Sequence, residues 1–390
     1  MAQALTSVEM IERLIAFDTT SRESNLALIE FVRDYLDGFR IASDLVFGND
    51  RRKANLFATI GPQDRGGVML SGHTDVVPVD GQAWEGEPFA VAERDGRLYG
   101  RGTSDMKSFI AIVLAMVPEF LAVTSATPVH LAFTYDEEVG CLGVRPLIAR
   151  LVGRPVKPRL CIIGEPTLMQ PVVAHKGKKS VRCLVRGHES HSALAHSGVN
   201  AIEAAAEIIA RIRQLAREKR DRGPYDPGFT PPYTTIHTGT VSGGTALNIV
   251  PRECRFDFEI RYLPGDDADA LLDELRRHAA SLVPEMHRVS AATGFEFDEY
   301  NAIPALAAAA DSEVVQLAQA LTGANGLGKV SFGTEGGLYQ QAGIPTVICG
   351  PGSIEQAHRP NEFIALDQVK QCEAFLHRLI ARLGSGGAAV

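Results

Sequence analysis

The sequence predicts an α/β fold with a smaller α+β domain inserted into it. Apolar, strand-like runs alternate with segments of helical spacing in the first and last parts of the chain. Between them the order changes to strand, helix, strand, strand, helix, strand. The 390 residues also exceed the usual size of one domain. We therefore expect a discontinuous domain of residues 1–178 and 303–390, and an inserted domain of residues 179–302.

Helices and buried strands are expected to alternate in the first domain. Thr6 and Glu9 have the spacing of a capping box, which predicts that a helix begins there. Apolar residues at helical spacing predict a second helix over about 25–36, and a long helix after Asp105 whose buried face extends to Val117. Strands are expected at 55–60, 129–135 and 160–164. A further strand is expected from the apolar run 68–70 into the polar stretch that contains His73 and is closed by Pro78. After the insertion we expect a helix at 312–321, a strand at 346–350, a helix at 367–382 and a frayed tail at 384–390.

The inserted domain has the order of a small ferredoxin-like unit. Asn200 and Glu203 predict the start of its first helix, and a Pro/Gly-rich loop follows that helix. The expected strands lie at 180–186, 235–241, 254–262 and 295–299, and the second helix lies at 268–282.

Composition limits the possible functions. The chain is 45% hydrophobic and 22% charged, as in an ordinary globular protein. Its net charge of −8 argues against nucleic acid as the main partner, because phosphate binding needs a basic surface. We expect no signal peptide and no membrane span, since the longest apolar run is too short. The six cysteines form no CxxC pair, so we expect reduced thiols, a packing role for Cys141 and a cytoplasmic protein.

Several predicted strands end in residues that can bind metal. His73 and Asp75 are two positions apart and face the same way on an extended chain. They are either a metal ligand with its orienting partner or a hydrogen-bonded pair that stabilises a turn. Glu137 and Glu138 end the next strand, where the alternative is a solvated turn.

Three more candidates occupy comparable places. Asp105 precedes the long helix, where it could simply be an N-cap, and Glu165 and His358 follow apolar strands. In α/β sheets, sites gather beyond the carboxyl ends of the strands, so one fold brings these residues together. The candidate ligands are His73, Asp105, Glu138, Glu165 and His358.

Two imidazoles and three carboxylates suit divalent metals, zinc above all. Three carboxylates would be excessive for one ion, but they balance most of the charge of two. The set therefore favours a two-metal site with a bridging carboxylate, an arrangement that is typical of hydrolysis. Glu137 remains as a free carboxylate that can accept a proton from water, and Asp75 is expected to orient His73.

Five segments together resemble the acetylornithine deacetylase / succinyl-diaminopimelate desuccinylase / carboxypeptidase family of dizinc hydrolases. The resemblance covers nearly the whole chain. It implies a zinc-peptidase-like catalytic domain with a mixed sheet flanked by helices, and an inserted lid or dimerisation domain. The matching segments are residues 71–78, 100–107, 136–138, 164–167 and 357–362.

The resemblance also implies roles for individual residues. His73 and Glu165 would bind one zinc ion, Glu138 and His358 the other, and Asp105 would bridge them. Co²⁺ could replace Zn²⁺. Glu137 would act as general acid and base, and the peptide after Asp105 would be cis.

The inserted domain is expected to supply His191, which would polarise the scissile carbonyl, often from the partner subunit of a homodimer. His188 and His196 are nearby alternatives, and Ser190 stands where the family pattern has glycine. Asn248 and Arg261 resemble the part of the family pattern that binds the substrate carboxylate. Arg261 could instead be a surface charge on its strand.

Substrate choice is predicted from Gly333, Thr334 and Glu335. These residues most resemble the family branch that removes the acetyl group from N2-acetyl-L-ornithine, in arginine biosynthesis. Glu335 would meet the side-chain ammonium, or it could be a structural carboxylate on a turn. The alternatives are a related desuccinylase, aminoacylase, carboxypeptidase or dipeptidase, and a catalytically inactive binding protein on the same fold.

Overall fold

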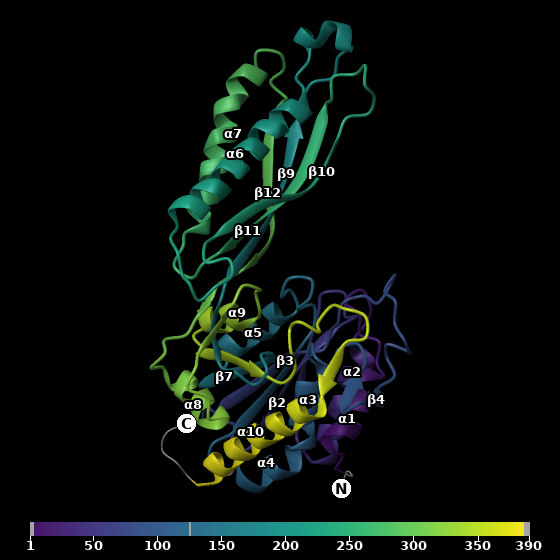
Figure 1. Ribbon diagram of the computed structural model, residues 1–390, viewed down its shortest axis with the longest axis vertical. Helices are drawn as coiled ribbons and strands as arrows, with labels where there is room; N and C mark the ends of the chain where they lie inside the picture. The colour runs from purple at the N-terminus through teal and green to yellow at the C-terminus, as the bar shows by residue number, and fades with distance from the viewer. Residues whose placement is uncertain (1–3, 125, 386–390) are drawn as a thin grey trace. The chain divides into compact units, whose positions relative to one another are not determined.

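The computed structural model describes residues 4–124 and 126–385, which form two compact units (Figure 1). The second unit comprises residues 175–305 and 330–333, and the first unit comprises the other described residues. The insertion thus begins four residues before the predicted boundary and ends three residues after it. Gly333 belongs to the second unit and Thr334 to the first.

The first unit is built on a mixed sheet in which four neighbouring strands at the centre run parallel. All four are buried along their whole length, as their apolar sequences predict for parallel strands that are covered on both faces. The strand order is β1 (Ser43–Phe47), β2 (Ala54–Ile60), β6 (Val129–Thr134), β3 (Val68–His73), β7 (Leu160–Pro166), β15 (Thr346–Gly350), β8 (Val172–His175) and β13 (Leu306–Ala307).

Three short strands form a separate small sheet, and a further strand joins the edge of the large one. The small sheet has the order β16 (Phe363–Ala365), β5 (Arg97–Tyr99) and β4 (Ala92–Arg94), and β14 (Gly328–Val330) pairs with β8.

Helices α3 (Lys107–Ala115) and α9 (Gly336–Gln341) cover opposite faces of this sheet. Successive residues of a strand point to opposite sides. The Ser71 hydroxyl lies 3.1 Å from the hydroxyl of Tyr339 on α9, whereas a Cβ at Gly72 would meet Ile110 of α3 at 3.0 Å. A Cβ at Gly164 would meet the ring of Phe109 at 2.0 Å. Glycine at both positions therefore lets α3 approach the centre of the sheet.

The capping box at the first helix is confirmed. The Thr6 hydroxyl accepts a hydrogen bond from the Glu9 amide, and the Glu9 carboxylate accepts one from the Thr6 amide. Helices α1 and α10 pack against α3 (Figure 1). Helices α2, α5 and α8 contact the sheet, and α4 packs against α10 and α3. The bounds are α1 (Ser7–Ile15), α2 (Leu26–Gly38), α4 (Val117–Val123), α5 (Val144–Val152), α8 (Glu313–Thr322) and α10 (Leu366–Gly384).

The prediction of one long helix after Asp105 is wrong. Helix α3 ends at Ala115, and α4 begins at Val117 with Pro118 in its first turn. Proline is favoured there and cannot continue a preceding helix, because it has no amide hydrogen. The predicted frayed tail lies mostly outside the described residues, which end at Ser385. Within the described ranges, no helix is long and apolar enough to cross a membrane.

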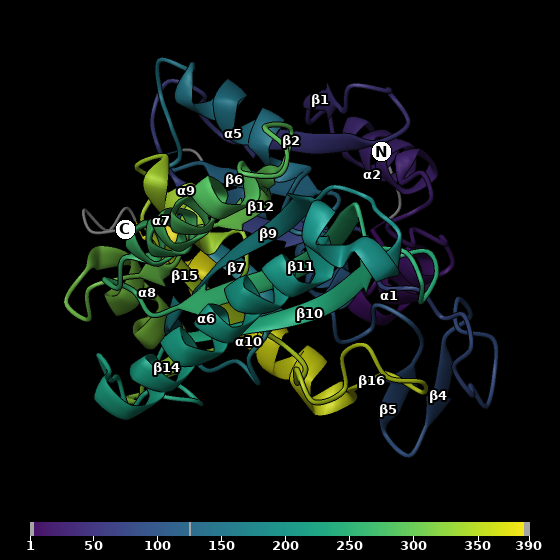
Figure 2. The same cartoon turned by 90° about the horizontal axis from the view of Figure 1, so that it is seen from above.

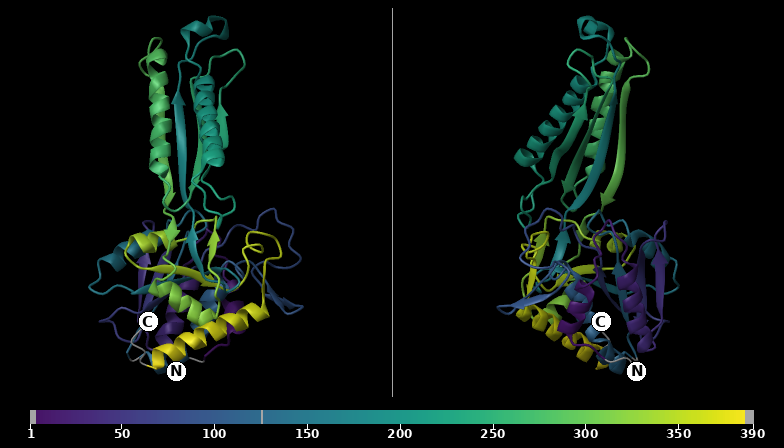
Figure 3. Two further views of the ribbon diagram at one scale, coloured as in Figure 1. Left: turned by 60° about the vertical axis from the view of Figure 1, so that its left-hand side comes forward. Right: turned by 90° about the vertical axis from the view of Figure 1, so that its right-hand side faces the viewer.

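The second unit confirms the ferredoxin-like order. Four antiparallel strands have the order β10 (Thr235–Gly243), β11 (Glu253–Tyr262), β9 (Gly177–Arg186) and β12 (Gly294–Ile303). Helices α6 (Ala201–Arg222) and α7 (Ala268–Met286) pack side by side on one face of this sheet (Figures 2 and 3). The strands therefore alternate between residues buried under the helices and more exposed ones, as in β11. A short 3₁₀ helix, η1 (Ser192–Ser197), precedes α6.

A buried histidine in the large sheet makes the stability of the fold depend on pH. His130 on β6 is 5% exposed and stacks on Phe57, and its Nδ1 lies 3.0 Å from the Thr59 hydroxyl. Among the described residues its Nε2 has no hydrogen-bond partner. Burial lowers the pKa of His130 to about 4 from the usual 6.5. Protonation is therefore favoured in the unfolded chain.

We predict that His130→Leu makes the free energy of unfolding depend less on pH below about 6.5. Because the folded-state pKa is depressed, the contribution of His130 is complete above pH 6.5 and is lost as the pH falls toward 4. That loss amounts to about 3 kcal/mol at most. Urea unfolding between pH 7 and pH 4.5 should show a smaller loss of free energy for the variant than for the native chain. His377→Gln, at an exposed position on α10, serves as the control. Parallel curves for His130→Leu and the native chain would contradict the prediction.

Candidate active site

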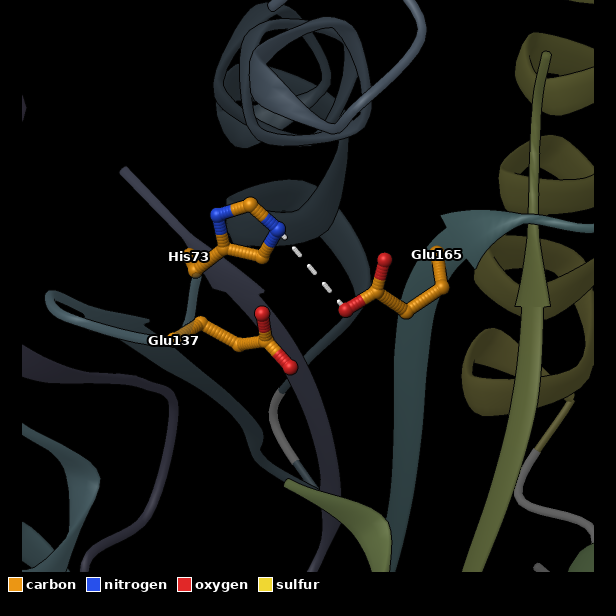
Figure 4. Close-up of side chains that lie close together, drawn as sticks. All are labelled: His73, Glu137 and Glu165. Carbon is orange, nitrogen blue, oxygen red and sulfur yellow. Dashed lines mark ion pairs between the residues drawn. The ribbon is translucent and has the colours of Figure 1, made fainter. Parts of the chain in front are cut away.

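The predicted metal ligands gather at one edge of the large sheet. His73 is the last residue of β3, Glu138 follows β6, Glu165 lies near the end of β7, and His358 is in the loop after β15. Because these four strands run parallel, their carboxyl ends meet at this edge. Asp105 reaches it from the turn before α3. Figure 4 shows the side chains of His73, Glu137 and Glu165 converging on a common space.

Asp105 lies between the two histidines. Its Oδ1 is 3.0 Å from Nε2 of His73, and its Oδ2 is 3.5 Å from Nε2 of His358. His73 Nε2 is also 3.8 Å from Glu165 Oε1, and His358 Nε2 is 2.9 Å from Glu138 Oε2. Each histidine therefore lies close to a different glutamate, and both histidines lie close to Asp105. The peptide bond between Asp105 and Met106 is cis, as predicted.

These distances fit a pair of divalent cations. Ligand atoms about 2.0–2.2 Å from one ion lie roughly 3–3.5 Å apart. Among the described residues, two groups of ligand atoms fall within 4.8 Å of one another. Both groups include His73, and neither includes His358. One consists of His73, Glu137 and Glu165, and the other of His73, Asp105 and Glu138. Nitrogen and carboxylate donors of this kind suit zinc and similar metals.

Crowding of buried carboxylates shapes the electrostatics of the site. Burial raises the pKa of Glu137 to about 8. The charge of His73 opposes this shift, and the charge of Glu138 adds to it. Burial and the charge of Asp105 raise the pKa of Glu138 to about 7. Hydrogen bonds to Asp105 and Glu138 raise the pKa of His358 to about 10. These side chains therefore hold protons between them, and a bound metal would displace those protons.

Asp105 is the exception among these acids. Burial alone would raise its pKa, yet hydrogen bonds from His358 and His73 hold that pKa well below its usual value. The carboxylate at the centre of the cluster therefore stays ionised, as a bridging ligand must.

Asp75 fixes the backbone of both active-site glutamates. Its carboxylate accepts hydrogen bonds from the amides of Glu137 (3.1 Å) and Glu138 (3.3 Å) and from the hydroxyl of Ser21 (2.7 Å). The imidazole of His73 donates from Nδ1 to the carbonyl oxygen of Asp75 at 2.9 Å, which leaves Nε2 for a metal. The backbone carbonyl of Asp75 thus makes the close contact to His73. The Asp75 carboxylate lies 3.6 Å from Nδ1 of His73 and binds the amides of the residues that follow β6.

Two contacts in this region involve residues to which we assigned no role at the site. The buried thiol of Cys141 donates to Glu137 Oε1 at 3.3 Å. The buried carboxylate of Glu362 accepts hydrogen bonds from the amides of Ser104 and Asp105. Glu362 ends one of the five motif segments, and that position was its only signal in the sequence.

The predicted substrate residues of the first unit are buried beside the cluster. Thr334 and Glu335 are 1% and 2% exposed and precede α9. Among the described residues, Oε1 of Glu335 has no hydrogen-bond partner. Burial raises the pKa of Glu335 to about 8, although a hydrogen bond from Thr134 opposes the shift.

The other predicted substrate residues belong to the second unit. His191 and Asn248 are exposed, and Nδ1 of His191 accepts a hydrogen bond from the Ala193 amide at 3.0 Å. A neutral His191 therefore carries its proton on Nε2. Arg261 is partly exposed and forms a 2.8 Å ion pair with Glu259.

Comparison with known proteins places these features in a family. Residues 69–382 match the model of Peptidase family M20/M25/M40. The chain is 34% identical over 386 residues to acetylornithine deacetylase of Pasteurella multocida (strain Pm70), with 97% of this chain and 98% of that protein covered.

Solved structures agree on the fold. Aminopeptidase PepT from Bacillus cereus ATCC 10987 has a TM-score of 0.74 at 20% identity and covers 97% of this chain and 98% of its own. The YXEP protein of Bacillus subtilis, described as a dinuclear metal binding peptidase from the M20 family, has a TM-score of 0.63 at 15% identity, with 97% and 98% covered. This chain belongs to Peptidase family M20/M25/M40.

Proposed function

We propose that this protein is an acetylornithine deacetylase. It would hydrolyse N2-acetyl-L-ornithine to L-ornithine and acetate, with two Zn²⁺ ions as its metals and Co²⁺ as a possible substitute. The observation that carries the chemistry is the Asp105 carboxylate, whose two oxygens face His73 and His358. The substrate assignment is supported by the 34% identity, over nearly the full length of both chains, to a relative of that name.

Five residues would hold the two metals. His73 and Glu165 would bind one ion, Glu138 and His358 the other, and Asp105 both. When bound, the ions would lower the pKa of a water molecule and polarise the acetyl carbonyl.

Glu137 would move the proton during the reaction. It would accept a proton from the water whose oxygen attacks the acetyl carbon, and then give that proton to the ornithine nitrogen as the C–N bond breaks. A carboxyl group beside the attacking water suits both steps, because it can accept a proton and return it within one cycle. The hydrogen bond from Cys141 and the amide contact to Asp75 fix where this carboxylate lies.

The remaining residues would bind the substrate. His191 would donate from Nε2 to the developing oxyanion, in keeping with the tautomer that its contact with Ala193 sets. Asn248 and Arg261 would bind the α-carboxylate, and Gly333 and Thr334 would line the pocket. Glu335 would pair with the side-chain ammonium, which would supply the partner that its buried Oε1 lacks among the described residues.

We also propose a cytoplasmic homodimer in which the second unit serves as lid and dimerisation domain. The six cysteines are buried and form no disulfide, which suits a reducing compartment. The dimer rests on the family resemblance, which also leaves open whether His191 acts within its own subunit.

The first prediction from this function concerns substrate choice. Zinc-reconstituted protein should release amine from N2-acetyl-L-ornithine with a kcat/KM about tenfold or more above that for N-succinyl-diaminopimelate, N-acetylmethionine or a dipeptide. A tenfold ratio corresponds to about 1.4 kcal/mol of preferential transition-state binding. If another substrate leads, the metal chemistry stands and the pocket assignment is wrong. Full metal loading without turnover of any of the four would instead favour a binding protein.

The second prediction concerns Glu137. Glu137→Gln should lower kcat by about 10²–10⁴-fold, because an amide cannot carry the proton from water to the leaving amine. Steady-state kinetics and metal analysis should be run together, and metal content should stay near that of the native chain. Glu12→Gln changes an exposed glutamate on α1 and serves as the matched control. A kcat close to the native value would remove Glu137 from the mechanism.

The third prediction concerns Glu335. Glu335→Gln should raise the KM for N2-acetyl-L-ornithine more than the KM for N-acetylmethionine, since only the first substrate carries a side-chain ammonium. Initial rates over a range of both substrates measure the difference. Equal effects on the two substrates would show that Glu335 is a structural carboxyl instead.

A further inference from the structure

A buried ion pair connects the two chain segments that carry Asp105 and His358. The side chains of Arg101 and Glu362 are 1% and 0% exposed, and Nη1 of Arg101 lies 2.6 Å from Oε2 of Glu362. We propose that this pair, together with Gln82, positions Asp105 and His358 and so sets the affinity of the protein for its metal ions. The inference rests on the proposed two-metal function.

Glu362 fixes the backbone that leads to Asp105. Its Oε1 accepts hydrogen bonds from the amides of Ser104 (2.8 Å) and Asp105 (3.0 Å). Its Oε2 accepts from the amide of Gly102 (3.1 Å) as well as from Arg101. Four donors on one carboxylate hold the whole turn from residue 101 to 105. No neutral side chain of similar size offers four acceptor positions with this arrangement.

Arg101 extends the network to the other metal ligand. Its second terminal nitrogen donates to Oε1 of Gln82 at 2.6 Å, and Nε2 of Gln82 donates to the carbonyl oxygen of His358 at 3.0 Å. His358 has a φ of 63°, a backbone conformation that non-glycine residues adopt only when their surroundings hold it. The planar fork of Arg101 bonds Glu362 and Gln82 from two separate nitrogens, a geometry that the single nitrogen of a lysine does not have.

A second link runs parallel to the first. The hydroxyl of Ser104 donates to the carbonyl oxygen of Ser353 at 3.0 Å and accepts from the Ser353 amide at 3.1 Å. Ser353 lies in the loop that leads from β15 to His358. The turn before α3 is therefore tied to the His358 loop at two separate places.

The energetics favour positioning over stability as the role of the pair. Removing two charges from water costs several kcal/mol per ion, so a buried pair is a poor way to stabilise a fold. Asp105 and His358, by contrast, must keep their ligand atoms about 3–3.5 Å apart for one ion to bind both. Residues that orient metal ligands commonly change metal affinity by about 10–100-fold when they are replaced.

The test is a Zn²⁺ titration of the metal-free full-length protein against a competing chelator. Glu362→Gln keeps the size of the side chain but replaces one acceptor oxygen with an amide nitrogen, so two donors lose their partner. We expect the weaker of the two Zn²⁺ ions to bind about 10–100-fold less tightly than in the native chain. Melting of each metal-free variant is recorded in parallel, so that weaker binding is not confused with unfolding.

Gln82→Ala is the second variant, because it removes the bond to the His358 carbonyl and the acceptor that Arg101 and Trp84 share. Gln82 is partly exposed, so its loss should leave the melting temperature of the metal-free protein near the native value. We expect weaker binding of one Zn²⁺ ion and unchanged binding of the other. If Glu362→Gln does not fold, this variant decides the question.

The control is Glu313→Gln, which breaks the exposed ion pair with Arg159 and should leave both affinities unchanged. Two Zn²⁺ ions bound with native affinity by Gln82→Ala, and by Glu362→Gln where it folds, would overturn the positioning role. A native chain that binds fewer than two Zn²⁺ ions would instead contradict the proposed function, so the two failures are distinguishable.

Discussion

The mutual repulsion of buried carboxylates is the constraint on which this structure depends. Asp105, Glu137, Glu138 and Glu165 gather at one sheet edge, where water is too scarce to screen them. Like charges at such distances cannot all stay ionised without cations. Burial together with this repulsion raises the pKa of Glu137 and of Glu138, and hydrogen bonds to Asp105 and Glu138 raise the pKa of His358. Two divalent cations would resolve the same repulsion with full ionisation.

The backbone of the fold holds these carboxylates close together despite their repulsion. Parallel strands deliver their ends to one edge, and the hydrogen bonds of each strand fix where its last side chain points. Asp75 and Glu362 then serve similar purposes on either side of the cluster. Each is a buried carboxylate that accepts backbone amides, from Glu137 and Glu138 in one case and from the turn before Asp105 in the other. If the carboxylate of Asp75 or of Glu362 moved, a candidate metal ligand would have to move with it.

Much of this could be predicted from the sequence, because apolar runs locate buried strands and polar residues at their ends locate the site. The candidate ligands His73, Glu138 and Glu165 follow from that pattern alone. The role of Glu362 does not, because it depends on the directions of three amide groups in a turn distant in sequence. Likewise, a spacing of two residues suggests that Asp75 contacts His73, but only the structure shows that its carboxylate holds the next strand end.

Specificity is harder to predict for a related reason. The residues proposed to bind substrate come from both units, and their sequence patterns also suit ordinary surface or turn roles. Glu335 illustrates how the structure adds to the argument. Its side chain is buried, and burial raises its pKa to about 8, so ionising this carboxyl is costly. An ammonium placed against it would favour its ionisation, since an opposite charge lowers the pKa of a carboxyl. The preference of the pocket for a cationic side chain would thus equal the energy of the ion pair less the cost of ionising Glu335, a cost that a neutral substrate does not incur.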